Sequence, residues 1–211
     1  HELNNPLTSV LGFAEILLAE ADPAVPREEL ECIRAEAQRC QKIVGNLLDL
    51  ARADKLRMAP LLVQDVVRKV EEFRAYAASA QGIRLRSEIA PDLPFVTGDF
   101  HRLVQAVLNL ATNAEYAVAA RERDRQIVLR AERTGACVAV EVEANGHGVA
   151  PDHPERIFEP FFTTKPRGRG TGLGLSLVRA TAVAHGGSIR VERAASGGAR
   201  FVFELPVATD V

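Results

Sequence analysis

The sequence has 211 residues, of which 47% are hydrophobic and 26% charged, a composition typical of a globular chain that buries one or two cores. Its formal net charge of −2 provides no overall attraction to nucleic acid or to an anionic membrane surface, so we expect neither as a partner. Its 3 cysteines, an odd number without metal-ligand spacing, argue against a disulfide framework and favour reduced thiols in a cytoplasmic protein.

The start of the chain already lies inside a helical pattern and has no capping residue before it, which predicts a cut from a longer protein. No apolar run reaches the roughly 18 residues of a membrane span, and no segment is typical of a signal peptide. We therefore expect a cytoplasmic fragment without membrane contact, from a parent that is either soluble or anchored through an upstream segment.

Two apolar stripes with helical spacing begin the sequence. The residues of the first stripe are Leu3, Leu7, Val10, Ala14 and Leu17, and those of the second are Leu30, Ile33, Ala37, Val44, Leu47 and Ala51. The short connector between them, after Asp22-Pro23, predicts an antiparallel helical hairpin. Each stripe is narrow and one hairpin has no third layer, so we expect a homodimer with a four-helix bundle. The alternative is that the stripes pack on the rest of the same chain.

A domain boundary is predicted where the helical pattern lapses, between Ala53 and Pro60. It divides the chain into residues 1–56 and 57–211. In the second part, helices are predicted over about 63–80, 98–121 and 172–185, and strands near 83–89, 126–133, 136–143, 188–193 and 199–207. Gly135 supplies a hairpin turn. This segregation of strands and helices predicts an α+β sandwich, one sheet backed by three helices.

The stretch TTKPRGRGTGLG, from Thr163 to Gly174, is a candidate anion-binding loop at the entrance to a helix. Glycines let backbone N–H groups approach an anion closely, and the helix dipole favours negative charge there. Lys165, Arg167 and Arg169 add positive charge. A glycine-rich turn is also a common structural feature, so this loop alone leaves both interpretations open.

Asn109 and Asn113 are four residues apart in NLATNAEYAV, which places both carboxamides on one helix face. A hard cation such as Mg²⁺ bridging phosphates would give them polar partners, whereas the alternative is a pair of capping or loop-bonding amides. In EANGHGV, Gly146 and Gly148 allow the backbone to turn tightly beneath a flat ligand.

Five segments in order resemble the motifs of sensor histidine kinases. HELNNPL resembles the H-box, NLATNA the N-box, ANGHG the first glycine box, RIFEPFFTTK the F-box and GTGLGLS the second glycine box. The resemblance covers essentially the whole chain. It implies a dimeric histidine-phosphotransfer hairpin followed by the Bergerat ATP-binding fold, which type II topoisomerases and a heat-shock chaperone share.

For the hairpin, the resemblance implies that His1 attacks the γ-phosphate of ATP through one ring nitrogen while Glu2, as general base, accepts the proton of the other. His1 lies about 200° around the helix from Leu3, so it should point away from the apolar seam. Asn5 faces the same side as His1, and its implied role is to orient water that removes phosphate from a response-regulator receiver domain.

For the nucleotide domain, the resemblance implies ATP and Mg²⁺ as cofactors. Asn113 is the implied Mg²⁺ ligand, Asn109 supports the phosphates, and Lys165 reaches the terminal phosphates from the lid. The phosphate-binding loop consists of Gly170, Thr171, Gly172, Leu173 and Gly174. Three aromatic residues, Phe158, Phe161 and Phe162, are expected to anchor the lid and pack on the hairpin, although three Phe so close together are more often core residues than site residues.

Ala144 departs from the family pattern, in which the first glycine box begins with an Asp that accepts a hydrogen bond from the adenine amino group. Asn145 is assigned to the nucleotide site with Gly146 and Gly148, but it is a poor substitute because neighbouring strand residues point to opposite faces. An unpaired buried donor costs about 1–3 kcal/mol, or roughly five- to a hundred-and-fiftyfold in affinity. Weakened ATP binding is therefore expected.

Two rival functions remain at this level. In one, a degenerate kinase binds its regulator through the hairpin as a phosphatase or scaffold, which Ala144 favours. In the other, a gyrase-like ATPase closes a clamp. Relatives that hydrolyse ATP tend to have a glutamate at the position of Asn109, and an amide cannot serve as that base. The protein histidine kinase is therefore the leading interpretation.

Overall fold

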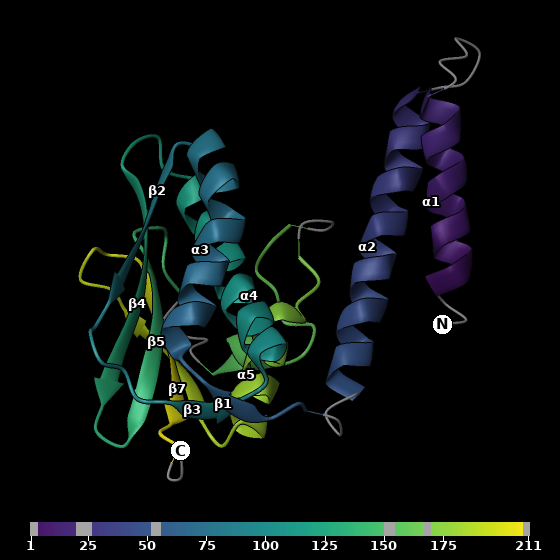
Figure 1. Ribbon diagram of the computed structural model, residues 1–211. Helices are drawn as coiled ribbons and strands as arrows, with labels where there is room; N and C mark the ends of the chain where they lie inside the picture. Colours follow the sequence, from purple (N-terminus) through teal and green to yellow (C-terminus); the bar gives the residue numbers. More distant parts are fainter. Residues whose placement is uncertain (1–3, 20–26, 52–55, 150–154, 167–169, 209–211) are drawn as a thin grey trace.

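The computed structural model describes residues 4–19, 27–51, 56–149, 155–166 and 170–208. Its first two helices, α1 (Asn4–Ala19) and α2 (Arg27–Ala51), lie side by side as the predicted hairpin (Figure 1). Ala14 of α1 and Leu30 and Ala37 of α2 are buried where the helices meet. The predicted end of the first helix, at Asp22-Pro23, lies outside the described residues.

The hairpin leaves much of its apolar surface exposed. Val10 and Leu17, which belong to the predicted stripe, are 45% and 40% exposed, whereas Ala14 in the same stripe is only 3% exposed. The exposed large apolar side chains of the hairpin are Val10, Phe13, Ile16, Leu17 and Ile33. One helix pair therefore buries only part of the stripe, and the remainder is not covered by other described residues of the chain.

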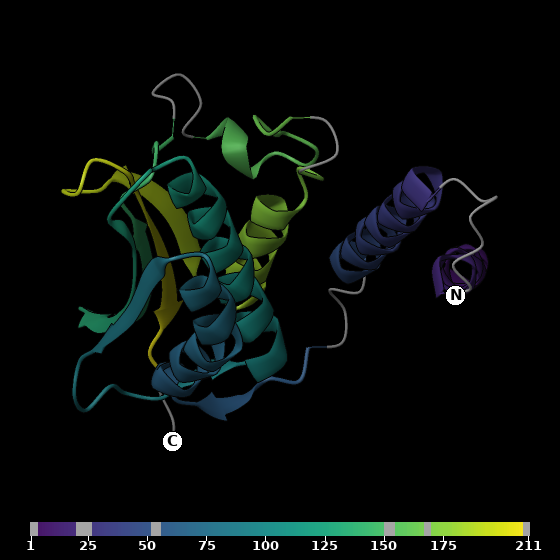
Figure 2. The same cartoon turned by 90° about the horizontal axis from the view of Figure 1, so that it is seen from above.

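The remainder forms the expected α+β domain. Its five-stranded sheet has the order β2 (Ile83–Ile89), β4 (Arg125–Thr134), β5 (Cys137–Ala144), β7 (Ala199–Pro206) and β6 (Ser188–Arg193). The β2–β4 pair is parallel and the other pairs are antiparallel, with Gly135 in the turn between β4 and β5. One face of the sheet is covered by α3 (Val63–Ala80), α4 (Phe100–Ala119) and α5 (Gly174–Ala184) (Figures 1 and 2).

Three short elements had not been predicted. β1 (Ala59–Leu61) pairs antiparallel with β3 (Val96–Gly98), and η1 (Arg156–Phe158) is a single 3₁₀ turn. β1 contains Pro60, and three residues are too few to show an alternating pattern. This small sheet follows the hairpin and leads directly into α3.

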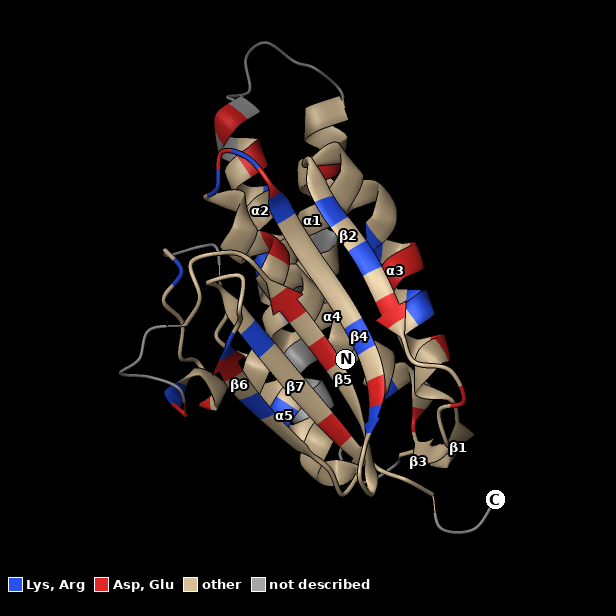
Figure 3. Cartoon of the chain, turned by 90° about the vertical axis from the view of Figure 1, so that its left-hand side faces the viewer, with Lys and Arg blue, Asp and Glu red and all other residues tan. Residues whose placement is uncertain are grey.

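The outer face of the large sheet carries alternating acidic and basic side chains (Figure 3). Arg130 on β4 contacts Glu88 at 2.7 Å and Glu143 at 2.6 Å. Arg200 on β7 lies 3.6 Å from Glu141, whose pKa is raised by burial. These pairs largely neutralise each other, so this face offers no concentrated charge for a ligand, and the candidate site lies on the helix-covered side.

Asp99 fixes the start of α4, the helix that carries both candidate asparagines. Its Oδ1 accepts hydrogen bonds from the backbone N–H groups of His101 at 3.1 Å and Arg102 at 3.2 Å, which makes it a helix N-cap. Its backbone N–H donates to Nε2 of the buried His185 at 2.9 Å, just after α5. This contact sets α4 and α5 in a fixed relation, and the cavity described below lies along both.

No helix among the described ranges is both long and apolar enough to cross a membrane.

Candidate functional site

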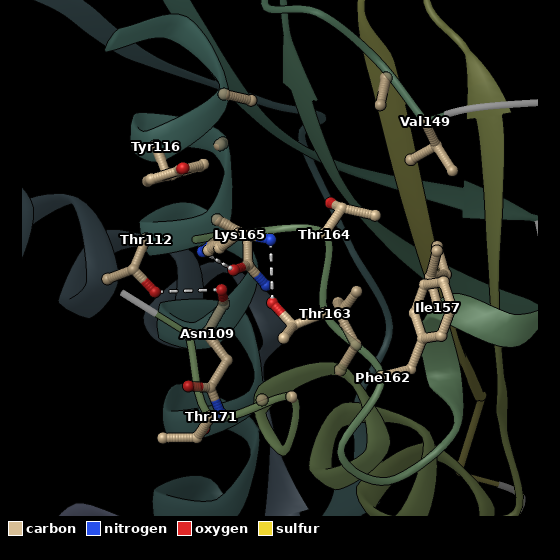
Figure 4. Close-up of a pocket in the computed structure, with 18 of the residues that line it drawn as sticks. Asn109, Thr112, Tyr116, Val149, Ile157, Phe162, Thr163, Thr164, Lys165 and Thr171 are labelled. Atoms are coloured by element: carbon tan, nitrogen blue, oxygen red, sulfur yellow. Dashed lines mark hydrogen bonds between the residues drawn. The ribbon is translucent and has the colours of Figure 1, made fainter. Parts of the chain in front are cut away.

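A cavity of about 660 Å³ lies between α4, the segment 155–166, the loop that enters α5, and the ends of β5 and β7. Polar side chains line one part, and Figure 4 shows Asn109, Thr112 and Lys165 close together there. The other part is apolar, with Val149, Ile157 and Phe162 on the opposite side of the view. A cavity of this size with one polar and one apolar end fits a nucleotide-sized ligand.

α4 presents Asn109, Asn113 and Tyr116 to the cavity, because residues three and four apart share one helix face. The opposite face is fully buried in the core through Leu103, Val107 and Leu110. Asn109 Nδ2 is buried and has no hydrogen-bond partner in the structure. A buried donor without an acceptor is unfavourable, and an oxygen of a bound ligand would satisfy it.

Lys165 connects the segment over the cavity to α4. Its Nζ donates to Asn113 Oδ1 at 2.8 Å and lies 4.3 Å from the centre of the Tyr116 ring. Its backbone N–H donates to Thr163 Oγ1 at 3.1 Å (Figure 4). The structure thus brings together two predicted site residues that are 52 positions apart in the sequence.

The glycine-rich loop passes close to the segment above it. Gly172 has a φ of +69°, its carbonyl accepts from the Phe161 N–H at 2.9 Å, and a Cβ there would lie 2.3 Å from the Phe161 carbonyl carbon. Only glycine fits this position. α5 begins at Gly174, where a Cβ would stand 3.8 Å from Asn109 Oδ1. The free N–H groups of this helix start therefore lie beside the carboxamide of Asn109, an arrangement suited to phosphate.

Of the predicted loop residues, Gly170, Thr171, Gly172 and Gly174 line the cavity. Leu173 is fully buried and does not line it. Arg167 and Arg169 fall outside the described residues. The loop thus offers backbone rather than the Leu173 side chain to a ligand.

Ala144 ends β5 with only 4% of its surface exposed, and it lines the apolar part of the cavity. It pairs with Ala199 on β7, and the neighbouring wall is formed by Val142 and Phe201. The methyl group of Ala144 thus lines the cavity at the position where the family motif has an aspartate.

Asn145 lies outside the cavity, contrary to its assignment from sequence. Its Oδ1 accepts from the Gln126 N–H at 2.9 Å, and its Nδ2 donates to the Asp124 carbonyl at 2.6 Å. Its amide is therefore occupied in holding the start of β4, as expected for a neighbour that points away from Ala144. Gly148 lines the cavity, but Gly146 does not: a Cβ there would lie 2.5 Å from the Ala117 backbone, so Gly146 serves close packing against α4.

The proposed reactive residues of the hairpin are not placed by the structure. His1 and Glu2 lie outside the described residues, and Asn5 is described only as part of α1. Their roles stay predictions. The cavity residues Gln38 and Arg39 of α2 were not predicted from the sequence. Both lie on a polar helix face, which is also typical of residues exposed to solvent.

Comparisons with known proteins match both parts of the chain. Residues 98–209 match the family described as histidine kinase-, DNA gyrase B- and HSP90-like ATPase, and residues 1–56 match the His Kinase A (phospho-acceptor) domain. The sensor histidine kinase ZraS of Escherichia coli O157:H7 is 35% identical over 98% of this chain and 44% of its own length. The sensor protein FixL of Bradyrhizobium diazoefficiens is 33% identical over 100% of this chain and 42% of its own length. The chain therefore spans less than half of these relatives.

Solved structures agree with these matches. A crystal structure of full-length ShkA in complex with AMPPNP has a TM-score of 0.81 and 33% identity, covering 100% of this chain and 45% of ShkA. Histidine kinase ThkA in complex with the response regulator protein TrrA has a TM-score of 0.73 and 28% identity, covering 99% of this chain and 59% of that one. With its phospho-acceptor hairpin followed by an α+β ATPase domain, the chain belongs to the sensor histidine kinases and represents their catalytic core.

Proposed function

We propose that this chain autophosphorylates His1 with ATP and passes the phosphoryl group to an aspartate of a response-regulator receiver domain. The hairpin of residues 1–56 is the phosphotransfer part and residues 57–211 are the ATP-binding part. The observation that carries this proposal is the buried, unpartnered Asn109 Nδ2 beside the glycine-rich start of α5, a donor suited to a phosphate oxygen.

Asn113 would hold Mg²⁺, because its Oδ1 lines the cavity and amide oxygens suit this hard cation. The cation would neutralise phosphate charge when bound. Asn109 supplies a hydrogen-bond donor but no base to activate water, so hydrolysis should be slow compared with transfer to the hairpin. Lys165 and the N–H groups around Gly172 and Gly174 add positive potential at the same end.

In the hairpin, His1 receives the phosphoryl group through one ring nitrogen and Glu2 accepts the proton from the other. Asn5 orients the water that later removes phosphate from the regulator. The exposed apolar residues of α1 and α2 support a homodimer, in which a second hairpin covers them. ThkA in its complex with the response regulator TrrA provides the analogy for a receiver-domain partner.

Ala144 weakens nucleotide binding in this proposal. Its methyl group lines the base end of the cavity without accepting a hydrogen bond from adenine, while the phosphate contacts are retained. By analogy, the complex of ShkA with AMPPNP supports the binding of an adenine nucleotide in this cavity.

The test is incubation of the chain with Mg²⁺ and ATP labelled at its γ-phosphate. We expect acid-labile, base-stable label that is absent from a His1→Gln variant and that passes to an added receiver domain. The proposal fails if no such label forms on the chain and restoration of the carboxylate by Ala144→Asp still yields none.

The apolar character of Ala144 and its surroundings favours a second candidate. In this case the chain binds its regulator as a phosphatase or scaffold, and nucleotide is regulatory or absent. Calorimetric titration with Mg²⁺–ATP separates the two, because micromolar binding supports the kinase and an absence of heat supports the scaffold. A clamp ATPase is disfavoured by Asn109, and steady-state hydrolysis by the His1→Gln variant would support it.

A further inference from the structure

Helix α2 has two faces with different partners. Leu30 and Ala37 are buried against α1, whereas Ala35, Gln38 and Arg39 line the cavity of the ATP-binding domain. At about 100° per residue, the mean directions of these two sets differ by roughly 145° around the helix. Figures 1 and 2 show the corresponding arrangement, with α2 lying between α1 and the ATP-binding domain.

Arg39 is the cavity residue of α2 with an unsatisfied polar atom. Its Nε is buried and has no hydrogen-bond partner. Its Nη1 is 3.5 Å from Glu36 Oε2, a long contact to a carboxylate whose side chain is 58% exposed. A contact of this kind contributes little. The guanidinium is thus held at the cavity wall by the backbone position of α2 rather than by a strong ion pair.

Helix α2 lies on the helix-covered side of the domain, where it contacts α5 (Figure 1). The first residue of α5, Gly174, lies beside Asn109 at the polar part of the cavity. Val142 and Ala144 of the apolar wall belong to β5, and α4 lies between β5 and α2 in Figure 1. An arginine approaching from the hairpin therefore reaches the phosphate end of the cavity and not the base end.

Two buried donors from different domains, Arg39 Nε and Asn109 Nδ2, thus lack acceptors at the walls of one cavity. Lys165 adds a second cation to the same lining. A polyanion would supply acceptors to both donors, and the planar guanidinium matches the geometry of a phosphate group.

We propose that Arg39 is a phosphate-binding residue contributed by the hairpin, which contacts the terminal phosphate of the bound nucleotide and so couples the hairpin to the ATP-binding domain. The inference rests on the proposed function, because it requires a nucleoside triphosphate in this cavity. The proposal adds to the nucleotide site a residue that lies outside the ATP-binding domain. It also predicts that the hairpin distinguishes triphosphate from diphosphate.

The test compares the whole chain with the variants Arg39→Ala, Arg39→Lys and Arg34→Ala by titration with Mg²⁺–AMPPNP and with Mg²⁺–ADP. Arg34→Ala is the matched control, since Arg34 is an exposed arginine of the same helix that does not line the cavity. Thermal unfolding of each variant without nucleotide checks that the hairpin still folds. Alanine is a good helix former, so we expect little change.

We expect Arg39→Ala to weaken AMPPNP binding at least about tenfold, as for a lost charge-assisted hydrogen bond, while ADP binding changes less than about twofold. Arg39→Lys should recover part of the loss, and Arg34→Ala should bind both nucleotides as the parent chain does. Equal effects of Arg39→Ala on both nucleotides, or none, would overturn the inference and leave the proposed function standing. If the parent chain and Arg34→Ala bind neither nucleotide, the proposed function fails and the inference fails with it.

Discussion

The Lys165 ammonium donates a hydrogen bond to Oδ1 of Asn113 across 2.8 Å, so the segment over the cavity is joined to α4 at the oxygen proposed to bind Mg²⁺. Although an amide oxygen has two lone pairs, an ammonium group and a Mg²⁺ ion bound to the same oxygen repel each other. Binding of the metal–nucleotide complex should therefore release Lys165 from Asn113. Lys165 would then be available to the phosphates, and the lid would move as the site fills.

Asn113→Ala should abolish the Mg²⁺ dependence of nucleotide binding. The variant lacks the amide oxygen that would bind the metal, so ATP should bind equally weakly with Mg²⁺ and with a chelator. Titration under both conditions measures the difference. Thr112→Ala is the control, because Thr112 lines the cavity and its hydroxyl donates to the Asn109 carbonyl within the same helix. A full Mg²⁺ effect in Asn113→Ala would contradict the assignment.

Ala144→Asp should strengthen ATP binding by roughly five- to a hundred-and-fiftyfold, the affinity equivalent of about 1–3 kcal/mol for a buried hydrogen bond. It should also raise the preference for ATP over GTP, because the carboxylate accepts from the adenine amino group. Calorimetry with both nucleotides measures this.

Ala144→Val adds volume at the same place without an acceptor and is the matched control. It should not strengthen ATP binding. Because residue 144 is almost fully buried, the aspartate should lower the melting temperature of the nucleotide-free chain, and ATP should restore it. An Asp variant with unchanged affinity and unchanged base preference would show that this position does not contact the base.

Phe13→Glu should convert the dimer to monomers. Phe13 is 67% exposed on α1, beside Val10 and Ile16, and a buried glutamate in a bundle interface lacks a partner. Sedimentation velocity at several concentrations measures the change. Tyr76→Glu is the control, because Tyr76 is 87% exposed but lies on α3, away from the hairpin (Figure 1). A Phe13→Glu chain that sediments like the parent would argue against this dimer face.

Asp99→Ala should reduce the free energy of unfolding by about 1–2 kcal/mol at neutral pH, because α4 loses its N-cap. Burial opposes ionisation of Asp99, but N–H donation from Arg57, Arg102 and His101 outweighs it and lowers its pKa. The stabilisation is therefore present above the unfolded pKa of about 4 and is lost as the pH falls through the folded value.

Thermal unfolding between acid and neutral pH tests this prediction. Asp99→Asn should retain most of the cap at neutral pH but lose the pH-dependent part, since an amide caps without titrating. If the stability of the parent and Asp99→Asn fell in parallel on acidification, ionisation of Asp99 would not be the cause.

Regular elements followed from the sequence where the residue pattern was long. The strand β2 and the helix α3 have the bounds that periodicity predicted, because seven and eighteen residues are enough to show a period. The strands β1 and β3 were missed, since three residues show no period. Their pairing depends on distant chain segments that meet only in the fold.

The sequence predicted those parts of the candidate site that depend on helix spacing or on glycine backbone geometry. Asn109 and Asn113 share a face of α4, and Gly172 has the positive φ that a glycine permits. Asn145 was assigned to the site but does not line the cavity, because its amide bonds Gln126 of β4 and the Asp124 carbonyl just before that strand. Arg39 could not be found from sequence, since a basic residue on a polar helix face also looks like a solvated side chain.

The most direct test is a crystal structure of the chain with Mg²⁺ and AMPPNP. It should show the triphosphate between Asn109, Arg39 and the start of α5, the metal on Asn113 Oδ1, and the Lys165–Asn113 hydrogen bond broken. A nucleotide bound elsewhere, or a filled cavity in which Lys165 still occupies Asn113 and no phosphate meets Asn109 Nδ2, would contradict the account.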